Sequence, residues 1–255
     1  QFPGFNMLNQ NGQNAVLSAF QGNVSAAAYV GFSLWKGLDG FQRNSQEAAK
    51  FVKFAADGGH VNSINVYGFM LDKGDGVPAN KQEALNYYKI AADQHNDPTA
   101  MYNVGLTARS MNNKQEAAAY FKRAADAGQF YACSSYGLML LNGDGIQPNK
   151  VQAVSYLKLA ADNGIANAMG IYGNIIRGLP QYTNIPGVTI NKQEAFSYIQ
   201  RAAAKGFPQS MYDYGMMLKD GEGCNRNPRE AVGYIKQAAD HGFIPAMNQY
   251  GVIMW

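Results

Sequence analysis

The sequence predicts an all-α protein built as a solenoid of helix pairs, and three recurring patterns in its 255 residues support this prediction. An alanine-rich motif occurs six times, a helix-capping signal precedes each copy, and a glycine recurs at a fixed place in the segment before that. Successive copies of the motif begin 36, 33, 36, 42 and 36 residues apart. A period in this range is typical of helix pairs that bury their apolar faces against their neighbours.

The alanine motif belongs to the second helix of each pair. Its copies are Ala55–Asp57, Ala91–Asp93, Ala124–Asp126, Ala160–Asp162, Ala202–Ala204 and Ala238–Asp240. In five repeats a glycine follows, where a residue of left-handed conformation can end the helix: Gly59, Gly128, Gly164, Gly206 and Gly242. The second repeat has His95 at this place instead.

Each second helix is expected to begin at an asparagine that is followed three residues later by Glu or Gln. The pairs are Asn44 and Glu47, Asn80 and Glu83, Asn113 and Glu116, Asn149 and Gln152, Asn191 and Glu194, and Asn227 and Glu230. This is the pattern of a capping box, in which the asparagine oxygen accepts a hydrogen bond from a free amide of the first turn.

A first helix is expected before each capping box, with a small residue and, five residues later, a glycine. The glycines are Gly31, Gly68, Gly105, Gly137, Gly173, Gly215 and Gly251. Glycine inside a helix costs about 1 kcal/mol relative to alanine, so its recurrence indicates that a neighbouring helix approaches closely there. The tyrosines that directly precede these glycines are expected to pack in the core, among them Tyr136, Tyr172, Tyr214 and Tyr250.

The loops inside the repeats carry a Gly-x-Gly pattern, as in Gly74–Val77, Gly143–Ile146 and Gly221–Cys224. None is followed by the Lys-Ser/Thr of a phosphate-binding loop, so no nucleotide and no other cofactor is predicted, and the loop acids are interpreted as turn formers. The fifth repeat replaces this loop with a longer insert, Gly178–Ile190, which contains Tyr182. Insertions in solenoids fall on one face, which makes this insert a candidate contact segment.

Together these landmarks resemble the Sel-one-like repeat family, relatives of the tetratricopeptide repeats, over about residues 23–255. The resemblance implies a right-handed α/α superhelix whose first helices line the concave side, and a role as an adaptor or scaffold in protein complexes. The implied repeats are approximately 23–58, 59–94, 95–127, 128–163, 164–205 and 206–241, with a half repeat at 242–255. Residues 1–22 form an N-terminal segment, with a degenerate helix expected at Ala15–Gln21.

Composition excludes several classes of partner. The 21 basic residues are dispersed among 18 acidic ones, for a formal charge of +3, so nucleic acid is not a predicted partner. No apolar stretch approaches the ~20 residues that span a bilayer. Cys133 and Cys224 lie about four helices apart, too far to bridge, so we expect a reducing, cytoplasmic location. The sequon Asn23–Ser25 leaves a lumenal location as the alternative.

No catalytic or metal site is predicted. His60, His95 and His241 lie in distant repeats near helix ends, where we expect them to contact terminal carbonyl groups. Ser33–Lys36 and Ser155–Lys158 match the Ser-x-x-Lys element of penicillin-recognising enzymes, but the accompanying Ser-Asp-Asn and Lys-Thr-Gly elements are absent. Hydrolysis of a cell-wall or β-lactam substrate is therefore the weakest hypothesis.

Charge is sorted between the two kinds of helix. The second helices are rich in Lys, Arg, Glu and Gln, whereas the first helices contain almost none of the charged types. A neutral surface with Asn, Ser, Tyr and Met suits a protein partner, although burial by neighbouring helices is an equal explanation. The partner-binding candidates are Asn62, Asn65, Tyr102, Ser134, Tyr212 and Asn248, with Tyr182 of the insert.

The leading functional hypothesis is a non-catalytic scaffold that holds protein partners, as a component of a larger hetero-complex. The alternative is a regulatory or targeting module of a longer chain that carries an enzyme domain. The last helix leaves an apolar face without a following helix, and we expect further chain or another subunit to cover it.

Overall fold

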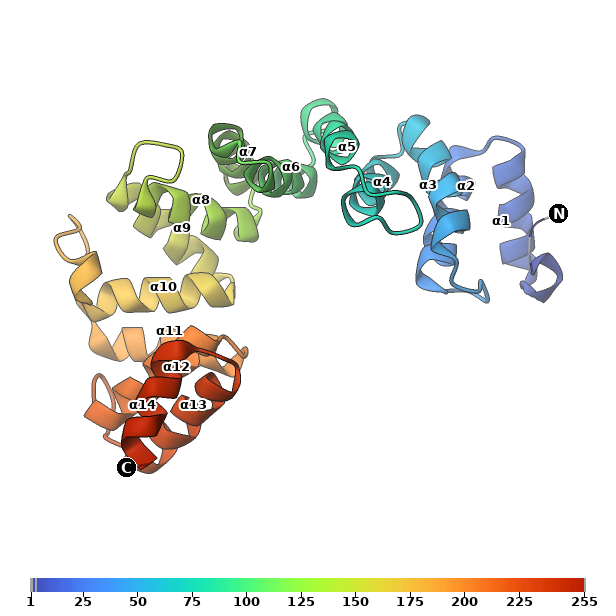
Figure 1. Cartoon of the computed structure of the whole chain (residues 1–255). Helices are drawn as coiled ribbons and strands as arrows, with labels where there is room; N and C mark the ends of the chain where they lie inside the picture. The colour runs from blue at the N-terminus through green and yellow to red at the C-terminus, as the bar shows by residue number, and fades with distance from the viewer. Residues whose placement is uncertain (1, 3, 255) are drawn as a thin grey trace. The chain divides into compact units, whose positions relative to one another are not determined.

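The computed structural model describes residue 2 and residues 4–254, and this part of the chain contains helices and no strands. Clustering of contacts divides the chain into two compact units, residues 1–124 and 125–255, which are described separately. Figure 1 shows the helices in both units as successive antiparallel pairs. The all-α repeat solenoid predicted from the sequence is confirmed.

The first unit begins with a short 3-10 helix, η1, at Phe5–Met7. Its α-helices are α1 Gln10–Phe20, α2 Val24–Lys36, α3 Ser45–Asp57, α4 Val61–Lys73, α5 Lys81–Gln94 and α6 Pro98–Ser110, and α7, Lys114–Asp126, runs across the boundary between the units. Helix α1 starts earlier than the degenerate helix expected at 15–21, because the Asn9 side chain caps it by accepting the Gly12 amide at 2.8 Å.

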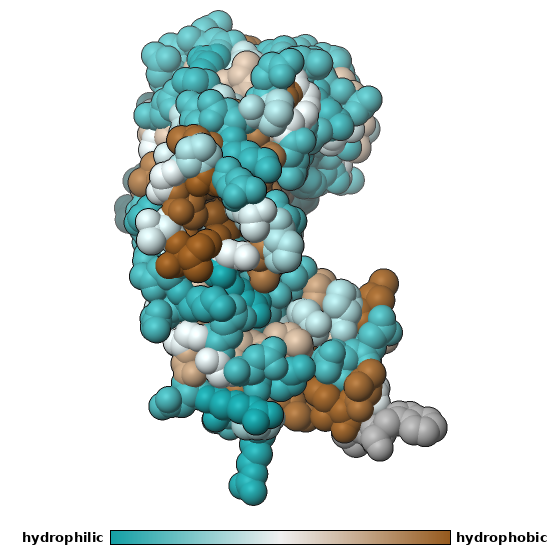
Figure 2. All heavy atoms as spheres, turned by 90° about the vertical axis from the view of Figure 1, so that its left-hand side faces the viewer, coloured by the Kyte–Doolittle hydropathy of each residue, from teal (hydrophilic) through white to brown (hydrophobic). Residues whose placement is uncertain are grey.

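The second unit contains α8 Phe130–Asn142, α9 Lys150–Asp162, α10 Ala166–Arg177, α11 Lys192–Ala204, α12 Pro208–Asp220, α13 Pro228–Asp240 and α14 Ile244–Met254. The insert between α10 and α11 carries a second 3-10 helix, η2, at Pro180–Tyr182. From α8 to α14, each helix in this unit packs against the next one along the chain. Hydrophilic residues cover most of the face seen in Figure 2, and hydrophobic residues are exposed there in separate patches.

The glycines of the first helices lie where a second helix crosses closely, as predicted. A Cβ atom placed on Gly137 would lie 2.9 Å from Leu157 Cγ of α9, and one on Gly173 would lie 2.7 Å from Ile199 Cγ1 of α11. Real Cβ atoms do not approach other atoms this closely, so any larger residue would push the two helices apart. Gly251 of α14 has open space around it, because no described helix follows.

The helix boundaries follow the predicted capping chemistry. The side chain of Asn44 accepts the Glu47 amide at 3.0 Å, and Asn80, Asn149, Asn191 and Asn227 cap their helices in the same way. At the other end, Gly59 has φ +83°. In the second repeat His95 keeps a right-handed conformation, and the following residue, Asn96, takes the left-handed one, with φ +51°.

The Gly-x-Gly loops contact the preceding repeat. A Cβ atom on Gly76 would overlap the carbonyl oxygen of Ser45 at the start of α3, and one on Gly223 would overlap that of Lys192 at the start of α11. The sequence predicted that the loop acids only form turns. At least one of them also contacts another repeat. Asp75 accepts the indole N–H of Trp35 at 2.7 Å, which joins this loop to the preceding repeat.

A hydrogen bond that was not predicted recurs between the second helices of neighbouring repeats. The aspartate that ends the alanine motif accepts a hydrogen bond from a tyrosine of the next second helix. The pairs are Tyr87 with Asp57 (2.9 Å), Tyr120 with Asp93 (2.8 Å), Tyr156 with Asp126 (2.6 Å) and Tyr198 with Asp162. Burial and this hydrogen bond raise the pKa of Tyr120 to about 12.

Candidate functional site

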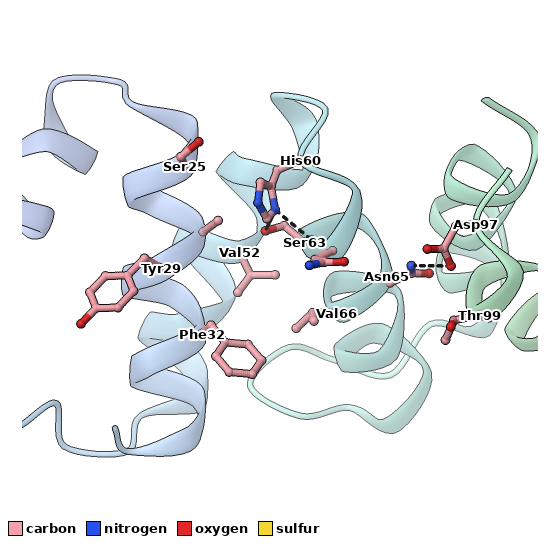
Figure 3. A pocket seen from close by; sticks show the side chains of 12 residues that line it. Ser25, Tyr29, Phe32, Val52, His60, Ser63, Asn65, Val66, Asp97 and Thr99 are labelled. Carbon is pink, nitrogen blue, oxygen red and sulfur yellow. Dashed lines mark hydrogen bonds between the residues drawn. The ribbon is translucent and has the colours of Figure 1, made fainter. Parts of the chain in front are cut away.

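A groove of about 520 Å³ lies in the first unit, along the first helices of three successive repeats. We call it the α2–α4–α6 groove. Its lining residues are Ser25, Ala28, Tyr29 and Phe32 of α2, Val52 of α3, His60 before α4, Asn62, Ser63, Asn65 and Val66 of α4, Asp97 before α6, and Thr99 of α6. Figure 3 shows these side chains from close by.

The side of the groove where Phe32 of α2 faces Val66 of α4 is apolar. Phe32 and Val66 extend toward one another in Figure 3, and Phe32 is 43% exposed, so its ring is available for contact. Tyr29 is 39% exposed and its hydroxyl donates to Asp39 at 2.8 Å. This hydrogen bond to the Asp39 carboxylate raises the pKa of Tyr29, so the phenol stays neutral at physiological pH.

The polar side of the groove is formed by Asn62, Ser63 and Asn65 of α4 and by Asp97 before α6. The Asn65 side-chain amide donates to the Asp97 carboxylate at 3.2 Å, and the same carboxylate oxygen caps α6 by accepting the Ala100 amide at 2.6 Å. Because Asp97 fixes which end of the Asn65 amide carries the nitrogen, the Asn65 Oδ1 atom is directed elsewhere. That oxygen is out of contact with solvent and has no hydrogen-bond partner.

His60 lies beside this polar side with a role that differs from the prediction. Its Nδ1 accepts the Ser63 amide at 3.3 Å and therefore caps the start of α4, rather than contacting a terminal carbonyl group. His241 does contact such a group, with Nδ1 lying 2.8 Å from the Gln237 carbonyl oxygen. The difference follows from position, since His60 precedes a helix and His241 ends one.

The structure brings two of the predicted contact residues, Asn62 and Asn65, into the groove. The others lie elsewhere. Tyr102 packs against Phe121, with ring centroids 5.6 Å apart, and Ser134 is buried. The remaining three belong to the second unit, where Tyr212 packs on Phe243, Asn248 is exposed on α14, and Tyr182 lines a different pocket beneath the insert.

Sequence reasoning missed Tyr29, Phe32 and Asp97 as groove residues. Phe32 follows Gly31, whereas the predicted contact positions precede the glycine of a first helix; Tyr29 precedes Gly31 and was not singled out. Asp97 directly precedes Pro98, and an aspartate before a proline at the first helical position is a signal for a helix cap that could have identified it.

In the two Ser-x-x-Lys matches, Ser33, Ser155 and Lys158 are buried or bonded within their own helices. Ser33 is buried, and the Ser155 hydroxyl donates to the Val151 carbonyl oxygen of its own helix at 3.4 Å. Lys158 pairs with Asp162 at 2.8 Å. Within residue 2 and residues 4–254, no group of three or more His, Cys, Asp or Glu side chains could hold a metal ion. No helix in the same part combines the length and apolar character needed to cross a membrane.

An array of helix pairs that presents a lined groove along its first helices defines an α-solenoid protein of the interaction-module class. The Sel1 repeat model matches residues 24–60, 62–96, 98–129, 130–165, 184–207 and 208–243. The chain therefore belongs to the Sel1 repeat family, whose members are generally protein-interaction modules.

Two solved structures are similar to this chain. One is c5321, a protective antigen present in uropathogenic Escherichia coli strains, with a TM-score of 0.82 and 24% identity over 96% of this chain. The chain spans 52% of that protein's length, so the likeness shows the fold alone. The other is a Sel1 repeat protein from Oxalobacter formigenes, with a TM-score of 0.73 and 25% identity over 86% of each chain. No curated protein has a significant match to the sequence.

Proposed function

We propose that the chain is a non-catalytic adaptor that holds an extended segment of a partner protein in the α2–α4–α6 groove. The observation that carries this proposal is the buried, unpartnered Asn65 Oδ1 at the side of the groove. A buried acceptor without a partner costs about 1–3 kcal/mol. A main-chain N–H of a bound segment that displaces the side chains covering this oxygen would recover that energy, since it is a strong donor that every non-proline residue carries.

The rest of the groove suits the side chains of such a segment. Phe32 and Val66 would contact an apolar side chain, and aromatic residues at exposed sites are frequent anchors of protein interfaces. Asp97 supplies the one carboxylate among the lining residues, which favours a neutral or basic segment over an acidic one. An adaptor of this kind would act within a hetero-complex, and the free thiols of Cys133 and Cys224 agree with a reducing, cytoplasmic location.

Selection from a library of random ten-residue peptides, followed by measurement of Kd by fluorescence anisotropy, tests this proposal. We expect peptides that bind the unaltered protein and lose at least tenfold in affinity on N62W, because the exposed Asn62 lines the groove and an indole there would obstruct it. N142W changes another exposed asparagine to the same residue outside the groove and should leave Kd unchanged. Equal effects of both variants would contradict the proposal.

N-methylation of the bound peptide, one amide at a time, tests the role of Asn65. One methylated position should weaken binding about fivefold or more, which corresponds to loss of a hydrogen bond of about 1 kcal/mol. In N65L the same methylation should have little further effect, because the acceptor is already gone. If methylation weakens binding equally in both proteins, Asn65 does not receive a main-chain N–H.

A further inference from the structure

The second unit contains a separate pocket of about 290 Å³ beneath the insert between α10 and α11. It is lined by Asn167, Gly170, Ile171 and Asn174 of α10, Leu179, Gln181 and Tyr182 of the insert, Phe207 before α12, and Gln209 and Ser210 of α12. We call it the insert pocket. Its volume lies near the lower end of the ~300–1,000 Å³ found for small-molecule sites, which leaves room for one long side chain.

Two nearly inaccessible polar side chains in the wall of this pocket have an unpartnered oxygen. Asn174 is 6% exposed and its Oδ1 has no hydrogen bond; Ser210 is 0% exposed and its Oγ has none. Buried polar atoms are almost always hydrogen-bonded in folded proteins. Two such oxygens on residues that line one pocket therefore indicate a missing donor. The Ser210 hydroxyl is directed at Gly170, where a Cβ atom would overlap it.

A buried carboxylate fixes the direction of the Asn174 oxygen. Asp213 is 5% exposed, and its Oδ2 accepts the Asn174 side-chain amide at 2.8 Å and the Gln209 amide at 3.3 Å. The nitrogen of Asn174 must face this carboxylate, so its oxygen faces away from it. Desolvation raises the pKa of Asp213, while the hydrogen bonds from Asn174 and Gln209 oppose this shift.

The nearby cations are already engaged. Arg177 donates from Nε and Nη2 to Glu222 at 2.8 and 2.6 Å, and Lys192 lies 3.2 Å from the other Glu222 oxygen. The positive charge of Arg177 lowers the pKa of Asp213, but less than the hydrogen bonds from Asn174 and Gln209 do. In the part of the chain that the structure describes, no Lys or Arg forms an ion pair with Asp213, and the pocket lining contains neither.

We propose that the insert pocket receives the guanidinium group of an arginine from the partner protein. A guanidinium has donors and no acceptors, so it can satisfy the Asn174 and Ser210 oxygens and place its charge near Asp213. It is also planar and stacks on aromatic rings, and Tyr182 and Phe207 both line the pocket. This inference rests on the proposed adaptor function for the source of the arginine.

The Asn174 and Ser210 oxygens are out of contact with solvent, so a lining side chain must turn aside as the guanidinium enters. Gln181 is exposed and Tyr182 is partly exposed, and both belong to η2 of the insert. The insert thus distinguishes this repeat from the others in function as well as in length.

A titration of the full chain with blocked amino acids tests the proposal. The probes are the N-acetyl, N′-methylamide derivatives of arginine, lysine and citrulline, with binding followed by the NMR shifts of the Asn174 and Gln209 side-chain amides. Citrulline has nearly the shape of arginine and lacks the charge. We expect the arginine probe to bind at least tenfold more tightly than either of the others. Equal binding of arginine and citrulline would overturn the proposal.

Two variants locate the binding. D213N keeps the shape of the carboxyl group and should weaken arginine binding about tenfold or more, and Y182A should weaken it severalfold. Y131A removes an exposed tyrosine of the same unit outside the pocket and should not change binding. If D213N and Y182A both bind the probe as the unaltered protein does, the guanidinium does not occupy this pocket. Y182A keeps the test valid even if D213N fails to fold.

Two further comparisons test the source of the arginine and separate the insert-pocket proposal from the adaptor proposal. Tighter binding of the blocked arginine than of free L-arginine would support a peptide source, and the reverse order would overturn it. Groove peptides that respond to N62W together with an arginine probe that does not bind would remove the insert-pocket proposal and keep the adaptor proposal. Binding of the probe without any groove-dependent peptide would do the opposite.

Discussion

Glycines in the middle of the first helices allow the helix pairs to pack closely. Gly137 has Leu157 Cγ 2.9 Å and the Ala153 carbonyl oxygen 3.2 Å from where a Cβ would stand, so both a side chain and the backbone of α9 block substitution. Gly251 occupies the same place in α14 with nothing within 4 Å. The two positions therefore separate the packing role of the glycine from its helix propensity.

G137A should lower the free energy of unfolding by about 1–3 kcal/mol, since overpacking outweighs the gain in helix propensity. G251A should leave it unchanged or raise it by up to about 1 kcal/mol, because only the propensity changes. Urea unfolding followed by circular dichroism measures both values. Equal destabilisation by the two substitutions would show that close helix approach is not the reason for the glycine.

The tyrosine–aspartate pairs predict a dependence on pH. Partial burial tends to raise the pKa of Asp93, but hydrogen bonds from Arg123 and Tyr120 outweigh it, so the pKa lies below its usual value. The charged form is thus favoured by folding. The resulting stability is present above the unfolded pKa of about 3.9 and is lost as the pH falls through the lower folded pKa.

The difference in unfolding free energy between the unaltered protein and D93N should accordingly shrink between about pH 5 and pH 2. Y120F, which removes one of the hydrogen bonds to Asp93, should show a smaller change over the same range. Urea titrations at several pH values provide the measurement. A constant difference across this range would mean that the Asp93 contacts do not favour its charged form.

Local patterns in the sequence predicted the helix caps and the glycine contacts, but not the tyrosine–aspartate hydrogen bonds. The Asn44 cap and the Gly137 contact could be predicted because both depend on residues close in sequence or on a repeated small residue. The hydrogen bond between Tyr120 and Asp93 joins residues 27 apart on different helices. Its partners become neighbours only once the spacing of consecutive second helices is known, and that spacing is a property of packing.

The Gly-x-Gly loops show how one helix pair is joined to the next. Gly76 has φ +80° and lies against the start of α3, whereas Gly59, with φ +83°, has open space around it. Both glycines are needed for their backbone conformation. Only Gly76 is also needed for contact between repeats, so a matched pair of substitutions can separate the two requirements.

G59A should cost about 1–2 kcal/mol for the left-handed conformation alone. G76A should cost clearly more and should also increase hydrogen exchange at the first turn of α3, because the loop would be forced away from the Ser45 carbonyl. Thermal unfolding and hydrogen-exchange mass spectrometry measure the two effects. Identical costs with no change in α3 would show that the loop does not support the preceding repeat.

The insert could be located from the sequence, but its structure could not be predicted. Its 178–190 range follows from the interrupted repeat pattern, and Tyr182 does line a pocket there. The buried Asn174 of that pocket lies on α10, and its partner Asp213 lies on α12, which also carries Lys219 and Asp220. An aspartate in the middle of a first helix, directly before Tyr214 and its glycine, was the signal that could have directed attention to this place.

Each repeat depends on its neighbours for burial, so protection should vary along the chain. Helix α12 packs against both α11 and α13, whereas α14 packs against α13 and leaves Ile244 68% and Val252 72% exposed. Two first helices of similar sequence type therefore differ in the number of faces that are covered.

Backbone amides of α14 should exchange with solvent hydrogen at least tenfold faster than those of α12 at neutral pH, because α14 can open without disturbing a following helix. Hydrogen-exchange mass spectrometry of the isolated chain measures this. Equal protection of the two helices would mean that the array opens as a single unit rather than from its end.

Two kinds of contact recur at the joints between repeats: a loop glycine lies against the preceding helix at Gly76 and Gly223, and a tyrosine hydroxyl donates to the preceding aspartate at four joints. A pulling force applied to the two termini would load these joints in series, and the weakest would yield first. With copies mostly 36 residues apart, each yielding repeat would release on the order of 120 Å of extended chain. The array would therefore act as a mechanical spring that lengthens in steps of nearly equal size, and a bound partner that bridges two repeats would stiffen the step between them.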